Sequence, residues 1–328
     1  TDTPDANPGN GKCADSNGNC SLRAAVMEAN ALAGEDSITL PEDTFKLTRS
    51  GTADNTAFQG DLDIIGKLTI TGAGEGKTII DGLDLNERVF EIQAGAVVTI
   101  TELTIQNAKE FTDSNDQGAG IRNLGTLTLS QIRVTNNRTS SSGGGIYNGE
   151  NAVLKLFHSQ VDNNYAPIGG GIYNAKNAHL TVENGEIYMN SATYGGGISN
   201  EKEGGQALIS HSTIRDNGAL MGGGVDILNG FVSLEQSMVS NNSADEAGGG
   251  ISIAFGEAVL INSTISANST CQEGGGIRIA SGKLSGYNTT IAENQASSAA
   301  VNDGCLNFGF PTTWTGGGVF QSGGQIDF

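Results

Sequence analysis

The sequence is poor in charged residues, in aromatic residues and in long apolar runs. Charged residues make up 16% of the 328 residues and aromatic residues 5%, with a single tryptophan. No stretch approaches the ~20 consecutive apolar residues that a transmembrane helix needs, so we expect no membrane insertion. Lysine and arginine total 17 against 36 acidic residues, giving a formal net charge of −19. This charge argues against nucleic acid and anionic membranes as partners.

Cysteine is also scarce, and its placement is informative. The four cysteines form two groups, Cys13 with Cys20 and Cys271 with Cys305, one toward each end of the chain. We expect two disulfides and hence an oxidising compartment. A zinc site is the alternative, but no Cys-x-x-Cys pair or histidine cluster accompanies these residues. The chain begins at Thr1, which a removed signal peptide or a shortened chain explains equally well. A secreted or cell-surface location is the expectation.

Glycine, by contrast, is abundant and recurs at a fixed interval. There are 49 glycines, and no Gly-X-Y period of the kind that collagen requires. A Gly-Gly-Gly-Ile segment or a close variant starts at seven positions that are 25 to 27 residues apart: Gly118, Gly143, Gly169, Gly195, Gly222, Gly248 and Gly274. Each period also contains short runs of alternating apolar residues, such as Leu127-Thr-Leu129, and no helical periodicity.

Three short strands per period predict an all-β fold. We expect a right-handed, single-stranded parallel β-helix in which each turn of about 26 residues rises by one strand spacing, ~4.8 Å. Equivalent residues of successive turns should then lie above one another. We expect an amino-terminal cap at 1–58, the β-helix at 59–296 and a carboxy-terminal cap or appendage at 297–328.

A column of asparagines runs in step with the glycines. Each follows a valine or isoleucine by three residues: Asn137, Asn164, Asn190, Asn217, Asn242, Asn268 and Asn294. Stacked amides at a bend can hydrogen-bond from turn to turn and satisfy backbone groups that the bend leaves unpaired. The spacing therefore predicts a structural asparagine ladder.

The amino-terminal end of such a solenoid must be capped. Ser21 is a good helix N-cap, and Leu22, Ala25, Val26 and Ala29 share one helical face, which predicts a short capping helix over 22–33.

Two segments resemble known families. The segment Cys20-Ser-Leu-Arg-Ala-Ala25, followed by Glu28-Ala-Asn30, resembles the CSLREA domain at the start of many secreted bacterial β-helix proteins, with Ala24 in place of the glutamate. The alternation of Gly-Gly-Gly-Ile with Val/Ile-x-x-Asn is similar to repeats in the passenger regions of chlamydial polymorphic outer-membrane proteins. These resemblances imply a bacterial secreted or surface β-helix, often adhesive, and no particular activity.

Four aromatic residues are candidates for assembly or binding. Tyr147 and Tyr173 occupy equivalent positions in neighbouring turns, in an outward column that continues as Ser199, Asp226, Ser252 and Arg278. Trp314 and Phe328 lie beyond the last regular period, where the chain forms either a final turn or a strand donated to another subunit.

Calcium is the one cofactor that the sequence suggests. Asp15, Asn17 and Asn19 offer alternating oxygen ligands, and Asp61 with Asp63 offers a second pair. A polar turn inside the Cys13–Cys20 loop is the alternative for the first group. His158 and His211 share a repeat position two turns apart, ~9.6 Å, which is too far for one zinc ion to bind both.

These observations predict a structural or adhesive surface protein that is not an enzyme. It could form the subunit of an extracellular filament through end-to-end self-association, or bind a protein or glycan of a host or cell surface. An extracellular polysaccharide lyase or hydrolase, or a glycan-binding β-helix, is the alternative. Such enzymes need paired carboxylates and aromatic sugar platforms, and the chain has no Asp-Asp or Gly-His-Gly motif and few aromatic residues.

Overall fold

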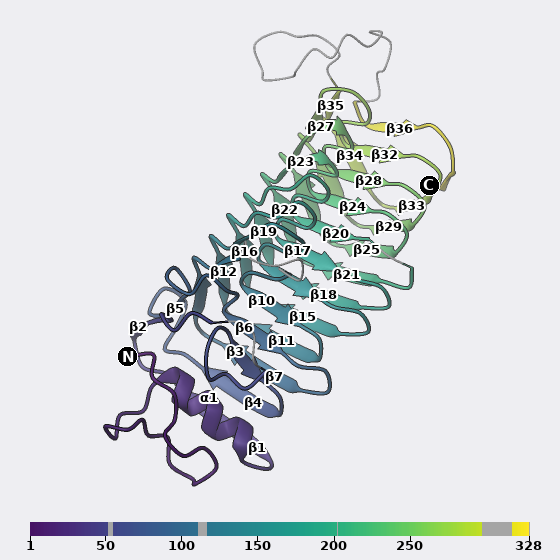
Figure 1. Cartoon of the computed structure of the whole chain (residues 1–328). Coiled ribbons are helices and arrows are strands. Elements are labelled where there is room, and N and C mark those ends of the chain that lie inside the picture. The colour runs from purple at the N-terminus through teal and green to yellow at the C-terminus, as the bar shows by residue number, and fades with distance from the viewer. Residues whose placement is uncertain (52–54, 111–116, 202, 297–316, 328) are drawn as a thin grey trace.

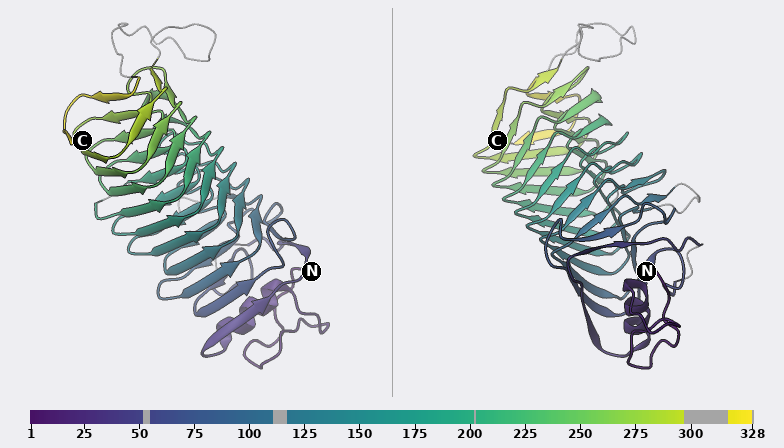
Figure 2. Two further views of the ribbon diagram at one scale, coloured as in Figure 1. Left: turned by 180° about the vertical axis from the view of Figure 1, so that it is seen from behind. Right: turned by 90° about the vertical axis from the view of Figure 1, so that its left-hand side faces the viewer.

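The chain folds into a parallel β-solenoid with one short helix (Figure 1). The computed structural model describes residues 1–51, 55–110, 117–201, 203–296 and 317–327. Consecutive strands belong to different sheets, and each strand pairs in parallel with the equivalent strand of the neighbouring coil. The amino and carboxyl termini therefore lie toward opposite ends of the stack (Figure 2). The predicted all-β parallel solenoid is confirmed.

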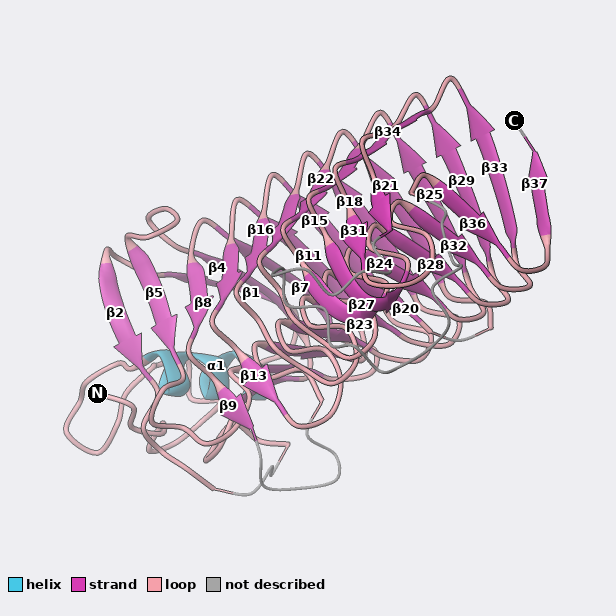
Figure 3. Cartoon of the chain, turned by 90° about the horizontal axis from the view of Figure 1, so that it is seen from above, coloured by secondary structure: helices cyan, strands magenta, loops and turns pink. Residues whose placement is uncertain are grey.

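Three long sheets run along the stack, as the view from above shows (Figure 3). Sheet A has eleven strands: β1 (Glu35–Thr39), β4 (Lys67–Thr71), β7 (Val97–Thr101), β11 (Thr126–Ser130), β15 (Val153–Phe157), β18 (His179–Glu183), β21 (Gln206–Ser210), β25 (Phe231–Glu235), β29 (Glu257–Ile261), β33 (Lys283–Tyr287) and β37 (Gln325–Asp327). Sheet B has ten: β2 (Asp43–Lys46), β5 (Thr78–Asp81), β8 (Thr104–Gln106), β12 (Arg133–Thr135), β16 (Gln160–Asp162), β19 (Glu186–Tyr188), β22 (Thr213–Arg215), β26 (Met238–Ser240), β30 (Thr264–Ser266) and β34 (Thr290–Ala292). Sheet C also has ten: β3 (Leu62–Ile64), β6 (Phe90–Ile92), β10 (Ile121–Asn123), β14 (Ile146–Asn148), β17 (Ile172–Asn174), β20 (Ile198–Asn200), β24 (Val225–Ile227), β28 (Ile251–Ile253), β32 (Ile277–Ile279) and β36 (Val319–Gln321).

Short ladders form in the segment that leads from sheet B to sheet C. One has four strands: β23 (Gly218–Met221), β27 (Ser243–Ala247), β31 (Ser269–Thr270) and β35 (Gln295–Ala296). The other pairs β9 (Lys109–Glu110) with β13 (Arg138–Thr139). The sequence predicted three strands per turn, so these short ladders are an addition. They arise because this bend also pairs with the equivalent bend of the neighbouring coil, with one irregularity between Ala219 and Met221.

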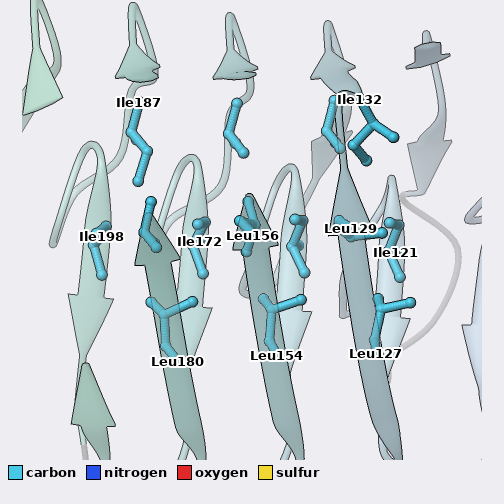
Figure 4. Packing of buried hydrophobic residues seen from close by; sticks show 14 of the residues in the cluster. Ile121, Leu127, Leu129, Ile132, Leu154, Leu156, Ile172, Leu180, Ile187 and Ile198 are labelled. Carbon is cyan, nitrogen blue, oxygen red and sulfur yellow. The ribbon is translucent and has the colours of Figure 1, made fainter. Parts of the chain in front are cut away.

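Aliphatic side chains fill the interior in columns. Leu127 of sheet A lies in register with Leu154, and Leu154 with Leu180. Isoleucines of sheet C stack in the same way and are fully buried (Figure 4). Only alternate residues of a strand face inward, which is why the sequence shows its two-residue alternation.

Two bends in each coil use residues with left-handed backbone conformation. After the sheet A strands, residues such as Gln131, His158 and His211 have φ between 49° and 54°. The two equivalent histidines are therefore bend residues. A second column with positive φ, which includes Asn163 and Asn241, immediately precedes each ladder asparagine.

The predicted asparagine ladder is present at the second bend. Nδ2 of each asparagine donates to Oδ1 of the next at 2.9–3.1 Å, from Asn137 through Asn294. The backbone N–H of each ladder residue donates to the same Oδ1. A second ladder, which the sequence analysis did not predict, joins Asn123, Asn148, Asn174 and Asn200 at 2.8 Å.

A helix caps the amino-terminal end. Helix α1 (Leu22–Ala31) begins after Ser21, whose hydroxyl accepts from Ala24 N at 3.0 Å, and lies at the end of the stack near β1 (Figure 1). Its buried face was only partly predicted: Ala24 and Met27 are buried, whereas Ala25 and Ala29 are half-buried. None of the described helices is long and apolar enough to span a bilayer.

Strand pairing extends beyond both predicted domain boundaries. Strands β1 and β2 lie within 1–58, yet they already pair with β4 and β5. At the other end, β36 and β37 lie within 297–328 and pair with β32 and β33. This terminal segment thus completes a coil of its own chain. Residues 297–316 lie outside the described residues.

Candidate functional site

The outward face of sheet C carries one polar or aromatic side chain per coil. Each sheet C strand has three residues, and its central residue points away from the aliphatic core. The strand registers align these central residues in one row, which we call the outer column: Asp63, Glu91, Arg122, Tyr147, Tyr173, Ser199, Asp226, Ser252, Arg278 and Phe320. The sequence predicted its middle part, from Tyr147 to Arg278.

The amino-terminal end of the outer column is a buried acidic cluster. Oxygen atoms of Asp61, Asp63 and Glu91 all lie within 4.8 Å of one another. Asp61 and Asp63 are fully buried, and Glu91 is 4% exposed. Two of these residues come from the loop and strand of one coil and the third from the next coil. The sequence proposed Asp61 and Asp63, and the structure adds Glu91.

Two arginines contact this acidic cluster. Arg88 Nη1 donates to Asp61 Oδ2 at 3.2 Å and also forms an ion pair with Glu91. Arg122 Nη1 lies 3.1 Å from Glu91 Oε1 and 3.2 Å from Glu91 Oε2. Burial raises the pKa of Asp61 well above its usual range, and the neighbouring charge of Asp63 adds to this, while Arg88 opposes it.

The two predicted tyrosines stack at the centre of the outer column. The ring centroids of Tyr147 and Tyr173 are 5.1 Å apart and the ring planes differ by 5°. They pack with Ile168 on the segment before the strand and with Ala178 after it. The Tyr173 hydroxyl donates to Glu201, and burial together with this carboxylate raises the pKa of Tyr173. The stack is thus mostly enclosed by its own coils.

Asp226 lies farther along the outer column, between two serines. Burial raises the pKa of Asp226 to about 7, with Glu201 adding to the shift and Arg278 opposing it. The Ser252 hydroxyl lies close enough to Asp226 to lower this pKa. Neither this hydroxyl nor that of Ser199 makes a hydrogen bond of normal geometry with the described residues. Asp226 is therefore a carboxyl group that changes charge near neutral pH.

A groove runs beside the outer column, along the turns that join sheet C to sheet A. It consists of two hollows, of about 690 Å³ and about 360 Å³, that share Asn229 and Phe255. Glycines at equivalent turn positions form its floor: Gly205, Gly230, Gly256, Gly282 and Gly324. A Cβ on Gly256 would approach Gly230 O to 2.3 Å, so the floor is bare backbone because the coils stack too closely there for side chains.

Polar side chains and one prominent aromatic ring line the walls of the groove. Phe255 is 65% exposed, the highest value among the large apolar residues of the described chain. Around it lie amides and charged groups: Lys176, Glu201, Glu203, Gln206, Asn229, Glu257, Lys283 and Gln325. Lys283 Nζ is 3.4 Å from Glu257 Oε1, an exposed pair. The groove thus offers an accessible aromatic face with hydrogen-bonding groups on both sides.

The remaining predicted site residues are the four cysteines and the two aromatic residues near the carboxyl end. Cys13 and Cys20 form a disulfide, as predicted. Cys305 lies outside the described residues, so the Cys271–Cys305 pairing stays a prediction. Trp314 and Phe328 also lie outside them.

The first candidate calcium loop does not join the acidic cluster. Asp15 Oδ1 accepts from the backbone N–H groups of Asn17 and Asn19, at 2.8 Å and 2.9 Å. Asp15 Oδ2 accepts from the Thr3 hydroxyl at 2.8 Å. The Asp15 oxygens therefore serve a hydrogen-bonded turn within the disulfide loop. This matches the polar-turn alternative for Asp15, Asn17 and Asn19.

A family model of the right-handed β-helix region matches residues 86–256, just over half of the chain. The chain belongs to the right-handed β-helix family. No curated protein sequence matches this β-helix protein. Among solved structures it is similar to a mannuronic acid specific polysaccharide family 6 lyase from the human gut microbiota, with 11% identity and a TM-score of 0.29 over 91% of this chain and 89% of that one.

Glu91 and Phe255 were not predicted from the sequence, for different reasons. Glu91 is the centre of Phe90-Glu91-Ile92, the same apolar–polar–apolar triplet as Leu62-Asp63-Ile64, so the repeat could have identified it. Phe255 lies in a turn of variable length and composition, where no repeat position is defined. Its exposure is visible only once the coils are stacked.

Proposed function

We propose that this β-helix protein binds a neutral glycan in the groove between sheets C and A, outside the cell or at its surface. The exposed ring of Phe255, set among amide and charged side chains, is the observation that carries the proposal. Sugar rings present an apolar face and a rim of hydroxyl groups, so an aromatic ring and flanking hydrogen-bonding groups complement both.

The shape of the groove favours an extended ligand. It follows equivalent turns of successive coils, from Lys176 to Gln325. Glycines of successive coils stack along its floor. A linear polymer could therefore contact several coils in the same way, at steps of about 4.8 Å.

A peptide ligand is less compatible with this surface. Peptides commonly add a strand to an unpaired sheet edge or place an apolar helix in an apolar groove. Along the side of the solenoid the described strands are already paired with neighbouring coils. The backbone at the groove floor is paired as well, since Lys283 N donates to Gly256 O and Glu257 N to Gly230 O.

The charge of the protein indicates which glycans to expect. The formal net charge is −19, and the groove carries Glu201, Glu203 and Glu257 against Lys176 and Lys283. The negative charge of the protein would repel a polyanionic glycan, although salt screens this repulsion at long range. A neutral polysaccharide meets no such penalty.

The residues that line the groove favour binding of a glycan without catalysis. The acid with a pKa near neutrality, Asp226, is 7% exposed and is not among the residues that line the groove. Adhesion to a glycan-bearing surface is the role that such binding would serve.

Affinity electrophoresis in gels containing neutral or anionic polysaccharides tests the proposal. We expect a neutral glucan, xylan or mannan to retard the wild-type protein, and Phe255→Ala to weaken binding at least tenfold. Tyr287→Ala is the matched control, because Tyr287 is a 58% exposed aromatic residue that does not line the groove. Retardation by anionic polymers alone, or undiminished binding by Phe255→Ala, would reject the proposal.

A head-to-tail filament stays a prediction without specific support. Helix α1 covers the amino-terminal end, and the edge strand β1 carries Glu35 and Asp36. Charged residues on an edge strand oppose the addition of another chain.

A further inference from the structure

We infer that the acidic cluster of Asp61, Asp63 and Glu91 is a binding site for one divalent cation, with calcium as its natural occupant. The site is independent of the proposed glycan groove. Its chemistry, its charge and its hydrogen bonding each point to a cation.

The donor set contains only oxygen. The three carboxylates place oxygen atoms within 4.8 Å of one another, which is close enough for a single ion to contact all three. Calcium takes oxygen ligands at 2.3–2.6 Å in flexible geometry, and a softer metal would prefer nitrogen or sulfur. None of the described residues at the cluster is a histidine or a cysteine.

One oxygen of the cluster is buried without a hydrogen bond. Asp61 is fully buried, and its Oδ1 accepts no hydrogen bond from the described residues. A buried carboxylate oxygen of this kind costs free energy unless a proton or a cation satisfies it. The other oxygen, Oδ2, already accepts from Arg88.

The amide of Gln93 shows a second excess of acceptors. Its Nε2 has two hydrogens but lies within hydrogen-bonding distance of three oxygen atoms. These are Asn55 Oδ1 at 2.9 Å, Asp63 Oδ1 at 2.9 Å and Glu91 Oε1 at 3.0 Å. More acceptors than donors therefore converge here, which is the condition that a bound cation relieves.

The formal charge of the cluster matches a divalent ion. Glu87 joins Asp63 and Glu91 in raising the electrostatic cost of ionising Asp61, so four acidic groups lie close together here. Two guanidinium groups, Arg88 and Arg122, oppose them. With every group ionised, two negative charges are left, and a calcium ion would neutralise both.

An ion at this position would join the amino-terminal cap to the solenoid. Asp61 lies in the loop that precedes β3, Asp63 in β3 and Glu91 in β6 of the next coil. The same loop is tied to α1, because the buried guanidinium of Arg23 donates to Gly60 O and Asp61 O. Calcium should therefore stabilise the end of the stack that α1 covers.

Calorimetric titration of the chelator-treated full chain with CaCl₂ tests this inference. We expect one calcium ion to bind per chain, and a saturating concentration to raise Tm by about 5 °C. Asp63→Asn and Glu91→Gln, each tested alone, should abolish both effects. Asp84→Asn, an exposed aspartate in the turn between β5 and β6, should leave both unchanged.

Absence of heat and of a Tm shift with calcium, magnesium and manganese would overturn the inference, as would wild-type affinity in both ligand variants. Crystals of the wild-type protein soaked in MnCl₂ decide the case even if these variants do not fold. An anomalous peak between the three carboxylates supports the site. A crystal without that peak refutes it.

Discussion

Each asparagine of the first ladder satisfies several buried groups at once. Asn190 Nδ2 donates to Val161 O at 2.9 Å and to Asn217 Oδ1 at 3.0 Å. Its Oδ1 accepts from both N and Nδ2 of Asn164, each at 3.0 Å. A single hydrogen bond contributes about 0.5–1.5 kcal/mol net, and leaving a buried partner unpaired costs about 1–3 kcal/mol. No other side chain of similar size has two donor hydrogens together with an acceptor oxygen.

Asp226 gives the protein a stability that depends on pH. Burial raises its pKa to about 7, whereas an aspartate in the unfolded chain has a pKa of about 3.9. Between about pH 4 and pH 7 the folded protein holds a proton that the unfolded chain has released. Asp226 therefore lowers stability as pH rises through this window, by up to about 1.4 kcal/mol per pH unit, and causes no further change above it.

The variant Asp226→Asn isolates this effect. At pH 8 we expect it to be more stable than the wild type by a few kcal/mol, because it removes a buried charge, and at pH 4 to differ little. Urea unfolding at both pH values measures the difference. The exposed Asp245→Asn serves as the control and should match the wild type at both. Equal stability of Asp226→Asn and wild type at pH 8 would show that Asp226 is not buried as described.

At the residue scale, sequence predicts positions better than it predicts environments. The repeat placed Tyr147, Ser199 and Asp226 in one column, and the strand registers confirm this. It could not show that Asp226 is buried. Burial depends on which side chains of the neighbouring coils cover a position, and these differ along the column: Ser199 and Ser252 flank Asp226.

Among the elements, the glycine triplets play two distinct physical roles. The first glycine of each triplet has positive φ, as at Gly169 with φ of 63°. The second and third lie against the backbone of the next coil. A Cβ on Gly170 would come within 2.4 Å of Ser191 O and 2.7 Å of Gly196 O. The triplet is therefore required by close approach between coils as well as by backbone conformation.

Gly170→Ala should consequently destabilise the solenoid. The added methyl group meets backbone that cannot move without shifting a neighbouring coil, so we expect a loss of about 1–3 kcal/mol or more. Thermal unfolding followed by circular dichroism measures the effect. Gly66→Ala is the control, because a Cβ there has no neighbour within 4 Å and φ is not positive. A Tm for Gly170→Ala equal to that of Gly66→Ala would contradict this account.

Elements were predictable where they repeat and less so where they do not. The three strands per coil and the ladder from Asn137 to Asn294 follow from spacing alone. The second ladder was missed because Asn123, Asn148, Asn174 and Asn200 give way to Ile227, Ile253 and Ile279 in later coils. The buried face of α1 was only partly predicted, since Arg23 and Glu28 are buried through contacts with irregular loops.

For the whole molecule, the stacking of near-identical coils makes stability a sum over neighbours. Ile146 pairs in register with Ile172, and Ile172 with Ile198. Deleting residues 169–194 removes one complete coil and would bring Ile146 opposite Ile198. The remaining chain should fold with every register intact.

We expect this deletion to give a folded protein whose denaturant m-value is lower by about 8%, in proportion to the chain removed. Deleting residues 169–181 removes half a coil and should prevent native folding, because the following strands would face the wrong sheet. Circular dichroism and urea unfolding distinguish the two. If the full-coil deletion is as unfolded as the half-coil deletion, stability does not arise mainly from contacts between neighbouring coils.

The layered hydrogen bonding also determines how the molecule would respond to tension. Because each coil contacts only the coils before and after it, a pull on β37 would be resisted by one layer of contacts at a time. Each detached layer would release about 90 Å of extended chain, while the layers nearer α1 kept their structure. If the proposed binding to a glycan-bearing surface holds the protein under flow, small successive yielding events of this kind would absorb a load before the attachment itself failed.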